Sequence, residues 1–230
     1  MPSKFRSNGR PISAVSSLII VLAPSFIKTI RIAMRLASAL AALLLPLQAF
    51  AGAQIYEPLS ASVAVQMSAA IADKGPIFLN FRNPDDAHKW TDDMSRRLRS
   101  RIPDRKERFE FLKTVQHEAI RAGLDPQMVL GLIQIESAFR KYAVSSSGAR
   151  GYMQVMPFWI KLIGKPSDNI FRLRTNLRYG CVIFRHYLDI EKGDFFRALG
   201  RYNGSLGHAE YPDAVHAAWR GRWKYDGATS

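Results

Sequence analysis

The sequence predicts a mainly α-helical protein with one compact domain behind an N-terminal export signal. The chain has 230 residues, 47% of them apolar, so it can bury a sizeable core. Apolar residues recur at helical spacing, whereas alternation typical of a strand is confined to residues 77–81. Sequence repeats of twenty to fifty residues are absent, which excludes solenoids and propellers.

Residues 1–51 have the composition of a targeting segment. They contain six basic residues and no acidic one, and an apolar run at 36–47 is followed by the small residues that signal peptidase prefers. This run is far shorter than the ~20 residues that span a bilayer. We therefore expect a signal peptide cleaved after Ala51, or alternatively after Ala53. The mature protein is expected to be periplasmic or otherwise exported, without a stable membrane span.

The beginning of this segment has several interpretations. Met34 by itself begins a complete signal peptide, which makes it a candidate for the true start. Alternatively, residues 1–33 form an unusually long n-region. An uncleaved anchor is a further alternative, although Pro24 interrupts the apolar run at 18–27.

Helices are expected along most of the mature chain. The Ala- and Ser-rich residues 52–75 favour either one weak helix or a mobile lead. An amphipathic helix is predicted from Ala87, and a second is predicted after Pro103, ending near Gly123. The apolar positions that predict these two helices are Ala87, Trp90, Met94 and Leu98, then Phe109, Leu112, Val115, Ala119 and Ile120.

A third helix is predicted to begin at Pro126, with Asp125 as its N-cap. Its apolar face contains Glu136, and Gln127 and Gln134 lie on the other face. The apolar members of that face are Val129, Leu132 and Ile133. Burial of a carboxylate without a basic partner, at the negative end of a helix dipole, raises its pKa, as a general acid requires. The alternative is a surface glutamate, with the helical phase displaced by one residue.

The segment after Glu136 resembles the lytic transglycosylase SLT domain. The similarity covers roughly residues 108–220, and two positions depart from the family pattern: Tyr152 replaces the usual Leu, and Gly200-Arg201 replaces Ala-Ala. The matching residues are Glu136-Ser137-Ala138-Phe139, Ala143, Ser145, the run from Gly148 to Pro157, Asn176-Leu177-Arg178-Tyr179-Gly180, and Tyr202-Asn203-Gly204.

This resemblance implies a mainly α fold of the α+β lysozyme-like type. It also implies cleavage of the β-1,4 bond between N-acetylmuramic acid and N-acetylglucosamine in peptidoglycan, which leaves a 1,6-anhydromuramoyl end. Glu136 would act as general acid and then as base, without consuming water. The implied organisation is a lead and helical extension at 52–107, the SLT domain at 108–220 and a C-terminal tail at 221–230.

The resemblance also assigns roles to residues around Glu136. Ser137, Gly148 and Gly151 belong to the structural motif, and glycine permits backbone conformations that a Cβ would block. The expected substrate-binding residues are Ser145, Gln154, Met156, Tyr202 and Asn203, with the Tyr202 hydroxyl beside Glu136. Each of four residues also has an alternative structural role. These roles are a turn hydrogen bond for Ser145, packing in the core for Met156 and for Tyr202, and a helix C-cap at Asn203-Gly204.

The sequence alone leaves three other functions open. A hydrolase like goose-type lysozyme would need a second carboxylate about 5–9.5 Å from Glu136. The candidates for that carboxylate are Asp125, Asp168, Asp189, Glu191, Asp194, Glu210 and Asp213. A non-catalytic peptidoglycan-binding protein is a second alternative. A third is a transglycosylase dedicated to a secretion or conjugation machine, with residues 52–107 as its docking portion.

The charge of the chain favours an anionic partner. Its formal net charge is +14, and removing residues 1–51 leaves +8. The sequence has no nucleic-acid-binding or phosphate-loop motif, so we expect peptidoglycan strands, with their acidic peptides, and not nucleic acid. The single cysteine, Cys181, excludes an internal disulfide, and the histidine spacing predicts no metal site and no cofactor.

Overall fold

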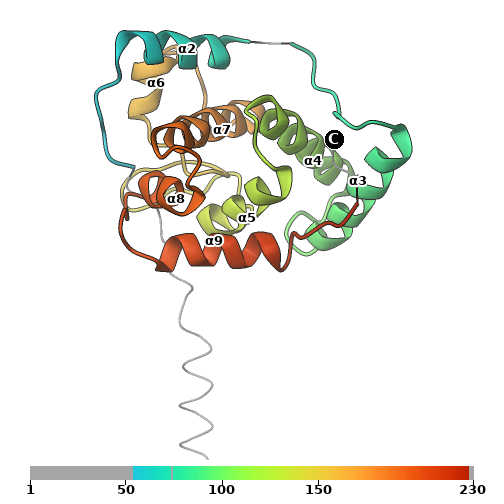
Figure 1. Cartoon of the computed structure of the whole chain (residues 1–230). Coiled ribbons are helices and arrows are strands. Elements are labelled where there is room, and N and C mark those ends of the chain that lie inside the picture. The colour runs from blue at the N-terminus through green and yellow to red at the C-terminus, as the bar shows by residue number, and fades with distance from the viewer. Residues whose placement is uncertain (1–53, 74, 228–230) are drawn as a thin grey trace, which may run out of the picture. The chain divides into compact units, whose positions relative to one another are not determined.

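The computed structural model describes residues 54–73 and 75–227, all within one compact unit, Gln48–Ser230. The predicted signal peptide lies outside the described residues. Those residues form eight α-helices and no β-strand, so the mainly α prediction is confirmed (Figure 1). None of these helices has the length and apolarity needed to cross a membrane. The helices are α2 (Ala61–Ala72), α3 (Pro84–Leu98), α4 (Arg105–Arg121), α5 (Pro126–Ser137), α6 (Phe158–Ile163), α7 (Leu173–Ile190), α8 (Phe195–Asn203) and α9 (Glu210–Arg220).

Most of these helices begin at a side-chain cap. The side chains of Ser60, Asn83, Asp104, Asp125 and Asp194 accept hydrogen bonds from backbone N–H groups in the first turns of α2, α3, α4, α5 and α8. The three helices predicted between residues 87 and 137 are therefore confirmed. Of the two expectations for residues 52–75, the helix is the correct one, because α2 forms there.

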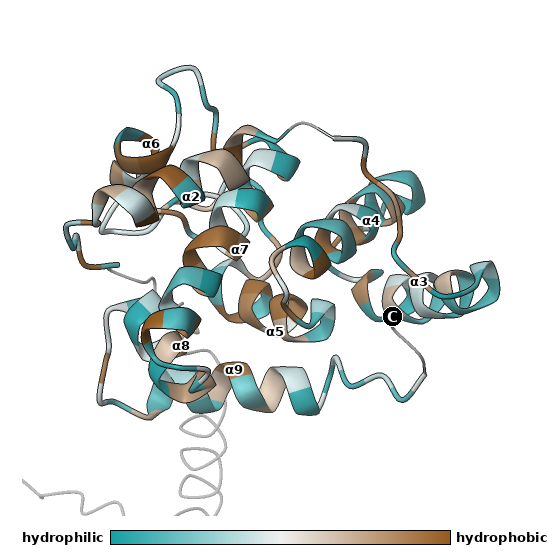
Figure 2. Ribbon diagram, turned by 45° about the horizontal axis from the view of Figure 1, so that its top comes forward, coloured by the Kyte–Doolittle hydropathy of each residue, from teal (hydrophilic) through white to brown (hydrophobic). Residues whose placement is uncertain are grey.

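The core is built around α5 and α7. Helix α5 packs between α4 and α9, and α7 contacts α2, α4 and α8. Helix α5 is mostly hydrophobic along its length, whereas α3 shows mainly hydrophilic residues (Figure 2). The backbones of α5 and α9 approach closely at Gly131, where an added Cβ would lie 3.0 Å from the Trp219 backbone nitrogen. This approach brings α9 alongside the end of α5.

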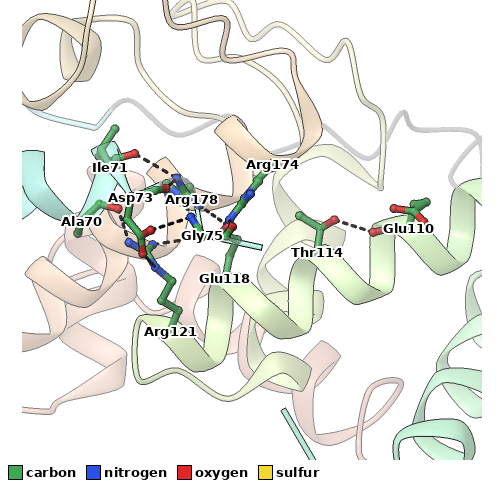
Figure 3. A network of polar contacts seen from close by, with 10 residues as sticks. All are labelled: Ala70, Ile71, Asp73, Gly75, Glu110, Thr114, Glu118, Arg121, Arg174 and Arg178. Atoms are coloured by element: carbon green, nitrogen blue, oxygen red, sulfur yellow. Dashed lines mark hydrogen bonds and ion pairs between the residues drawn. The ribbon is translucent and has the colours of Figure 1, made fainter. Parts of the chain in front are cut away.

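The segment before residue 108 packs on the rest of the unit. Helix α2 contacts α6 and α7, and α3 contacts α4. A polar network fixes the end of α2: Glu118 of α4 binds three arginines, which also donate to backbone carbonyls of residues 70–75 (Figure 3). The arginines are Arg121, Arg174 and Arg178.

The strand predicted at residues 77–81 is wrong. This segment has no regular secondary structure, and its backbone hydrogen bonds at Asn80 go to a side chain instead. Asn80 N donates to Gln116 Oε1 at 3.0 Å, and Gln116 Nε2 donates to Asn80 O at 2.8 Å. The apolar alternation therefore reflects a stretch lying against α4, where no second strand is available to pair with it.

Candidate active site

Glu136 lies in the last turn of α5, with 2% of its surface exposed. The burial expected from the helical pattern is confirmed, and the alternative of a surface glutamate is wrong. Gln127, expected on the opposite face, is buried as well. Helix α5 is therefore enclosed on nearly all sides, and its end delivers a carboxyl group into the protein interior.

The chain turns sharply directly after Glu136. Ala138 and Phe139 both adopt positive φ angles, 49° and 65°, which are uncommon for residues with a Cβ. Aromatic packing supports this turn, because the Phe139 ring lies 5.9 Å from Phe111 and 5.3 Å from Trp223, centroid to centroid. The Arg140 guanidinium donates to the Ser137 carbonyl at 3.0 Å and so satisfies one group at the helix end. Ser137 itself is fully buried.

The carboxyl group of Glu136 has one protein hydrogen-bond partner among the described residues. The Tyr211 hydroxyl, from the first turn of α9, donates to Oε1, whereas Oε2 is buried without a partner there. Burial raises the pKa of Glu136 to about 8, and the hydrogen bond from Tyr211 opposes this shift. At neutral pH the group therefore holds a proton that it can donate.

A second buried glutamate shows the opposite electrostatics. Glu118 is 1% exposed, and burial raises its pKa, but hydrogen bonds and charge from Arg178, Arg174 and Arg121 outweigh that effect. Its pKa therefore lies below the ordinary value, and Glu118 is an ionised structural anchor. The two residues differ in their partners and not in their burial, which singles out Glu136 as the candidate acid.

The loop after Glu136 is fastened to α7 by one side chain. Asn176 accepts from Met153 N at 2.8 Å and donates to the carbonyls of Arg150 and Ile170, at 2.9 and 2.8 Å. Gly151 adopts a φ of 78°, and an added Cβ would lie 2.3 Å from Asn176 Nδ2. The stretch beginning at Asn176 thus positions the loop, which explains why glycine is needed at 151.

Two of the predicted substrate-binding residues use their side chains to hold this loop. Ser145 Oγ accepts from Ala149 N at 3.0 Å, which is a turn bond. Gln154 is buried with a φ of 47°, and its Nε2 donates to the carbonyls of Ala143 and Gly151. In this structure both side chains shape the loop. The backbone carbonyl of Gln154 accepts a hydrogen bond from Gln54.

The structure brings the other three predicted residues near the same region. The Tyr202 hydroxyl donates to the Met153 carbonyl at 2.7 Å, while the partner of Glu136 is Tyr211. Burial raises the pKa of Tyr202 most, and the nearby Glu136 raises it further. Met156 is half-buried, and Asn203 is buried at the end of α8. Sequence reasoning missed Tyr211, because nothing links positions 75 residues apart before the α5–α9 packing is known.

The other carboxylates considered as second acids have partners of their own. Asp168 accepts from the Tyr179 hydroxyl, Glu191 binds Arg197 and Arg201, and Asp189 binds Arg185. Among the described residues, no neighbouring carboxyl group contributes to the pKa of Glu136. Asp125 and Asp194 are helix caps, and Glu210 and Asp213 are exposed.

A hollow of about 510 Å³ lies elsewhere, between α2 and α7. Its lining includes Val63, His186 and Asp189 but no buried carboxylate. The unpaired acid at Glu136, and not the size of this hollow, therefore locates the candidate active site.

A protonated carboxyl group buried at the end of a core helix, beside a glycine-containing loop, is a candidate acid–base site on a helical fold. Comparison with known proteins specifies the class. Residues 113–215 match the family described as Transglycosylase SLT domain. This match includes Glu136, the loop, Asn176 and Tyr211, so the resemblance found in the sequence is confirmed over this part of the chain.

Similar proteins carry related names. The chain is 31% identical over 103 residues to a transglycosylase of Enterobacteria phage PRD1, which covers 45% of this chain and 38% of that protein. It is 34% identical over 113 residues to membrane-bound lytic murein transglycosylase C of Histophilus somni (strain 2336), covering 42% and 31%. It is 42% identical over 114 residues to the protein of that name from Haemophilus influenzae (strain PittEE), covering 43% and 32%. The chain thus matches less than two-fifths of each relative's length.

Proposed function

We propose that this protein is a peptidoglycan lytic transglycosylase. It cleaves the β-1,4 bond between N-acetylmuramic acid and N-acetylglucosamine and leaves a 1,6-anhydromuramoyl end. The observation that carries the proposal is the Glu136 carboxyl group, buried without a basic partner, with a pKa of about 8. The SLT domain at residues 113–215 and the names of its relatives support the same reaction.

In the first step Glu136 acts as the general acid. Its proton passes to the glycosidic oxygen as the bond from that oxygen to C1 of N-acetylmuramic acid breaks, and positive charge develops at C1. The departing N-acetylglucosamine leaves as a neutral alcohol. The carboxylate that remains faces the positive charge in a buried environment, where their attraction is stronger than in water.

In the second step Glu136 acts as the base. The carboxylate takes the proton of the C6 hydroxyl of the same sugar while O6 forms the bond to C1. This transfer restores the protonated acid, and no water enters the balance. The Tyr211 hydroxyl donates to Oε1 and holds the carboxyl group in place, so Oε2 is the oxygen left to exchange protons with the sugar.

The electrostatics of the site support a mechanism with one carboxylate. A hydrolase with two carboxylates places them about 5–9.5 Å apart, where a neighbouring negative charge would add to the pKa shift of Glu136. Among the described residues, burial is the cause of that upward shift, and the hydrogen bond from Tyr211 opposes it. The candidate second acids instead bind arginines or a tyrosine hydroxyl, cap helices or lie in solvent.

We further propose that the enzyme works on the cell wall after export. The net charge of +8 on residues 52–230 favours contact with the acidic peptides and polymers of the wall. Ser145, Gln154, Met156, Tyr202 and Asn203 would line or shape the sugar-binding surface around Glu136. A secretion or conjugation machine is a further candidate partner, since such a machine must cross the wall.

The test compares the purified protein with Glu136→Gln on peptidoglycan and follows release of soluble fragments. The substitution is nearly isosteric, so we expect a folded protein whose rate falls by at least about 100-fold. Glu210→Gln is the matched control, because it removes an exposed glutamate next to Tyr211 and should retain the rate. Full activity of Glu136→Gln would refute the assigned acid, and loss of activity in Glu210→Gln would indicate a second carboxylate.

A further inference from the structure

The first described residue of the chain enters the candidate active site. Gln54 begins a lead, residues 54–60, which is extended and continues into α2; it is the bluest described segment in Figure 1. The lead is mostly exposed, with Leu59 half-buried, but Gln54 is only 4% exposed. A buried polar side chain at the head of an exposed segment needs an explanation in its contacts.

The carboxamide of Gln54 is bound on both sides. Its Oε1 accepts from the indole Nε1 of Trp159 at 2.8 Å and from Met156 N at 3.4 Å, and its Nε2 donates to the Gln154 carbonyl at 3.5 Å. These partners come from the end of the loop that follows Glu136 and from α6. They lie about one hundred positions away in the chain, so the contacts are tertiary and not part of a local turn.

The pocket that holds Gln54 adjoins the reacting group. The Tyr202 hydroxyl interacts with both groups: burial and the charge of Glu136 raise its pKa, and a hydrogen bond with the Gln54 side chain lowers it. The same hydroxyl donates to the carbonyl of Met153, in the loop that carries Gln154 and Met156. Gln54 and Tyr202 thus both bind the loop that follows Glu136.

The chemistry of this pocket matches an acetamido group. A primary carboxamide presents a carbonyl acceptor beside an N–H donor, and the pocket supplies two donors and one acceptor to meet them. The acetamido group of an N-acetylated sugar presents the same pair of groups. Both sugars of the proposed substrate carry that group, so Gln54 and a glycan strand would compete for the same hydrogen bonds.

Leu59 packs against the core, but the contacts of the lead nearer to Gln54 are weak surface contacts. Glu57 forms an ion pair with Arg201 at 3.0 Å, and its side chain is 46% exposed. The exposed Tyr56 ring meets Phe158 edge-on at 5.7 Å. Surface ion pairs are weak and are screened by salt. Arg201 is also a position at which the sequence departs from the usual Ala-Ala, and the pair with Glu57 gives that arginine a role.

We propose that residues 54–60 are an internal competitor of the substrate: Gln54 fills a pocket for a sugar acetamido group, and the lead withdraws when glycan binds. This inference rests on the proposed function for the identity of the sugar. In the absence of substrate, residues 54–60 close the site. The apparent dissociation constant for glycan then equals the intrinsic constant divided by the fraction of open protein.

The test is a calorimetric titration of a trimer of β-1,4-linked N-acetylglucosamine into the full chain carrying Glu136→Gln. It measures the dissociation constant of the trimer. In that background Gln54→Ala should tighten binding by about 10-fold if the lead is closed about 90% of the time. Glu57→Gln, which weakens the anchor and leaves the pocket intact, should tighten binding by about 2-fold. The control is Gln66→Ala, an exposed glutamine of α2, which should bind as the background does.

Equal, weaker or absent binding in Gln54→Ala and Glu57→Gln would overturn the proposal, because it would make Gln54 a fixed part of the binding surface. Glu57→Gln gives this answer even where Gln54→Ala does not fold. Since the background protein cannot cleave, the result does not depend on the reaction. Tighter trimer binding, together with a Gln54→Ala chain that keeps Glu136 and still leaves peptidoglycan intact, would support the closed lead and refute the proposed function separately.

Discussion

The hydroxyl of Tyr211 donates a hydrogen bond to Oε1 of Glu136, which lies 75 residues earlier in the chain. The packing of α9 along α5 brings the two residues together, with Gly131 allowing the close approach. This single contact fixes one oxygen of the carboxyl group and leaves Oε2 without a partner in the described part of the chain. The geometry of the site therefore depends on the packing of α5 and α9 as much as on the acid itself.

Removing the Tyr211 hydroxyl should slow the reaction. Tyr211→Phe keeps the ring but loses the hydrogen bond that lowers the pKa of Glu136, so that pKa should rise above about 8. We expect kcat to fall by about 10- to 100-fold and the alkaline limb of the pH profile to move to higher pH. Tyr225→Phe, outside the site, is the control. An unchanged kcat and profile would show that the contact has no part in the reaction.

The buried acid should make stability depend on pH. The pKa of Glu136 is about 8 in the folded protein and near the ordinary value of 4.5 when unfolded, so its contribution is full below pH 4.5 and is lost as pH rises through about 8. Glu136→Gln removes this loss. Relative to wild type, it should gain up to about 5 kcal/mol between pH 4.5 and 9, measured by denaturant unfolding. A difference that does not change with pH would mean that the pKa is not raised.

Neutralising the other buried glutamate should have the opposite effect. Glu118→Gln leaves Arg178, which is itself buried, without its charged partner and weakens the network that holds the end of α2. We expect a loss of about 3 kcal/mol of unfolding free energy at pH 7, where Glu136→Gln is neutral or stabilising. Unfolding curves of the two variants, recorded side by side, test this contrast. Equal effects would contradict the assignment of separate roles.

Substitutions at two glycines of the loop distinguish the cost of backbone strain from the cost of a steric collision. Gly148 and Gly151 have φ angles of 86° and 78°, but only at Gly151 would a Cβ collide, at 2.3 Å from Asn176 Nδ2. Gly148→Ala should cost about 1–2 kcal/mol, the penalty of the left-handed conformation. Gly151→Ala should cost more and should also abolish cleavage by displacing the loop. If the two substitutions cost the same, Asn176 does not fix the loop as described.

Much of this arrangement could be predicted from local sequence. The N-cap at Asp125 and the proline after it define the start of α5, and apolar spacing then places Glu136 on a buried face. Periodicity reports which residues share a helix face, and that information suffices to find a misplaced carboxyl group. The predicted C-cap at Gly204 also forms, with a φ of 76°.

Other features could not be predicted, because they depend on tertiary packing. The run at 77–81 alternates like a strand, but pairing needs a second strand and the fold offers the Gln116 side chain instead. The partner of Glu136 is Tyr211 and not the Tyr202 of the recognised motif, since only the docking of α9 decides which hydroxyl reaches the acid. The contacts of Gln54 with the loop likewise join segments that have no local relationship.

The most direct test of the central claim is the mass of the products. Peptidoglycan digested by the protein should yield muropeptides one water lighter than hydrolysed ones, because O6 of the muramoyl sugar replaces water at C1. These products should be absent when Glu136→Gln is used. Hydrated products with a reducing end would contradict the account and would require a second carboxylate beside Glu136.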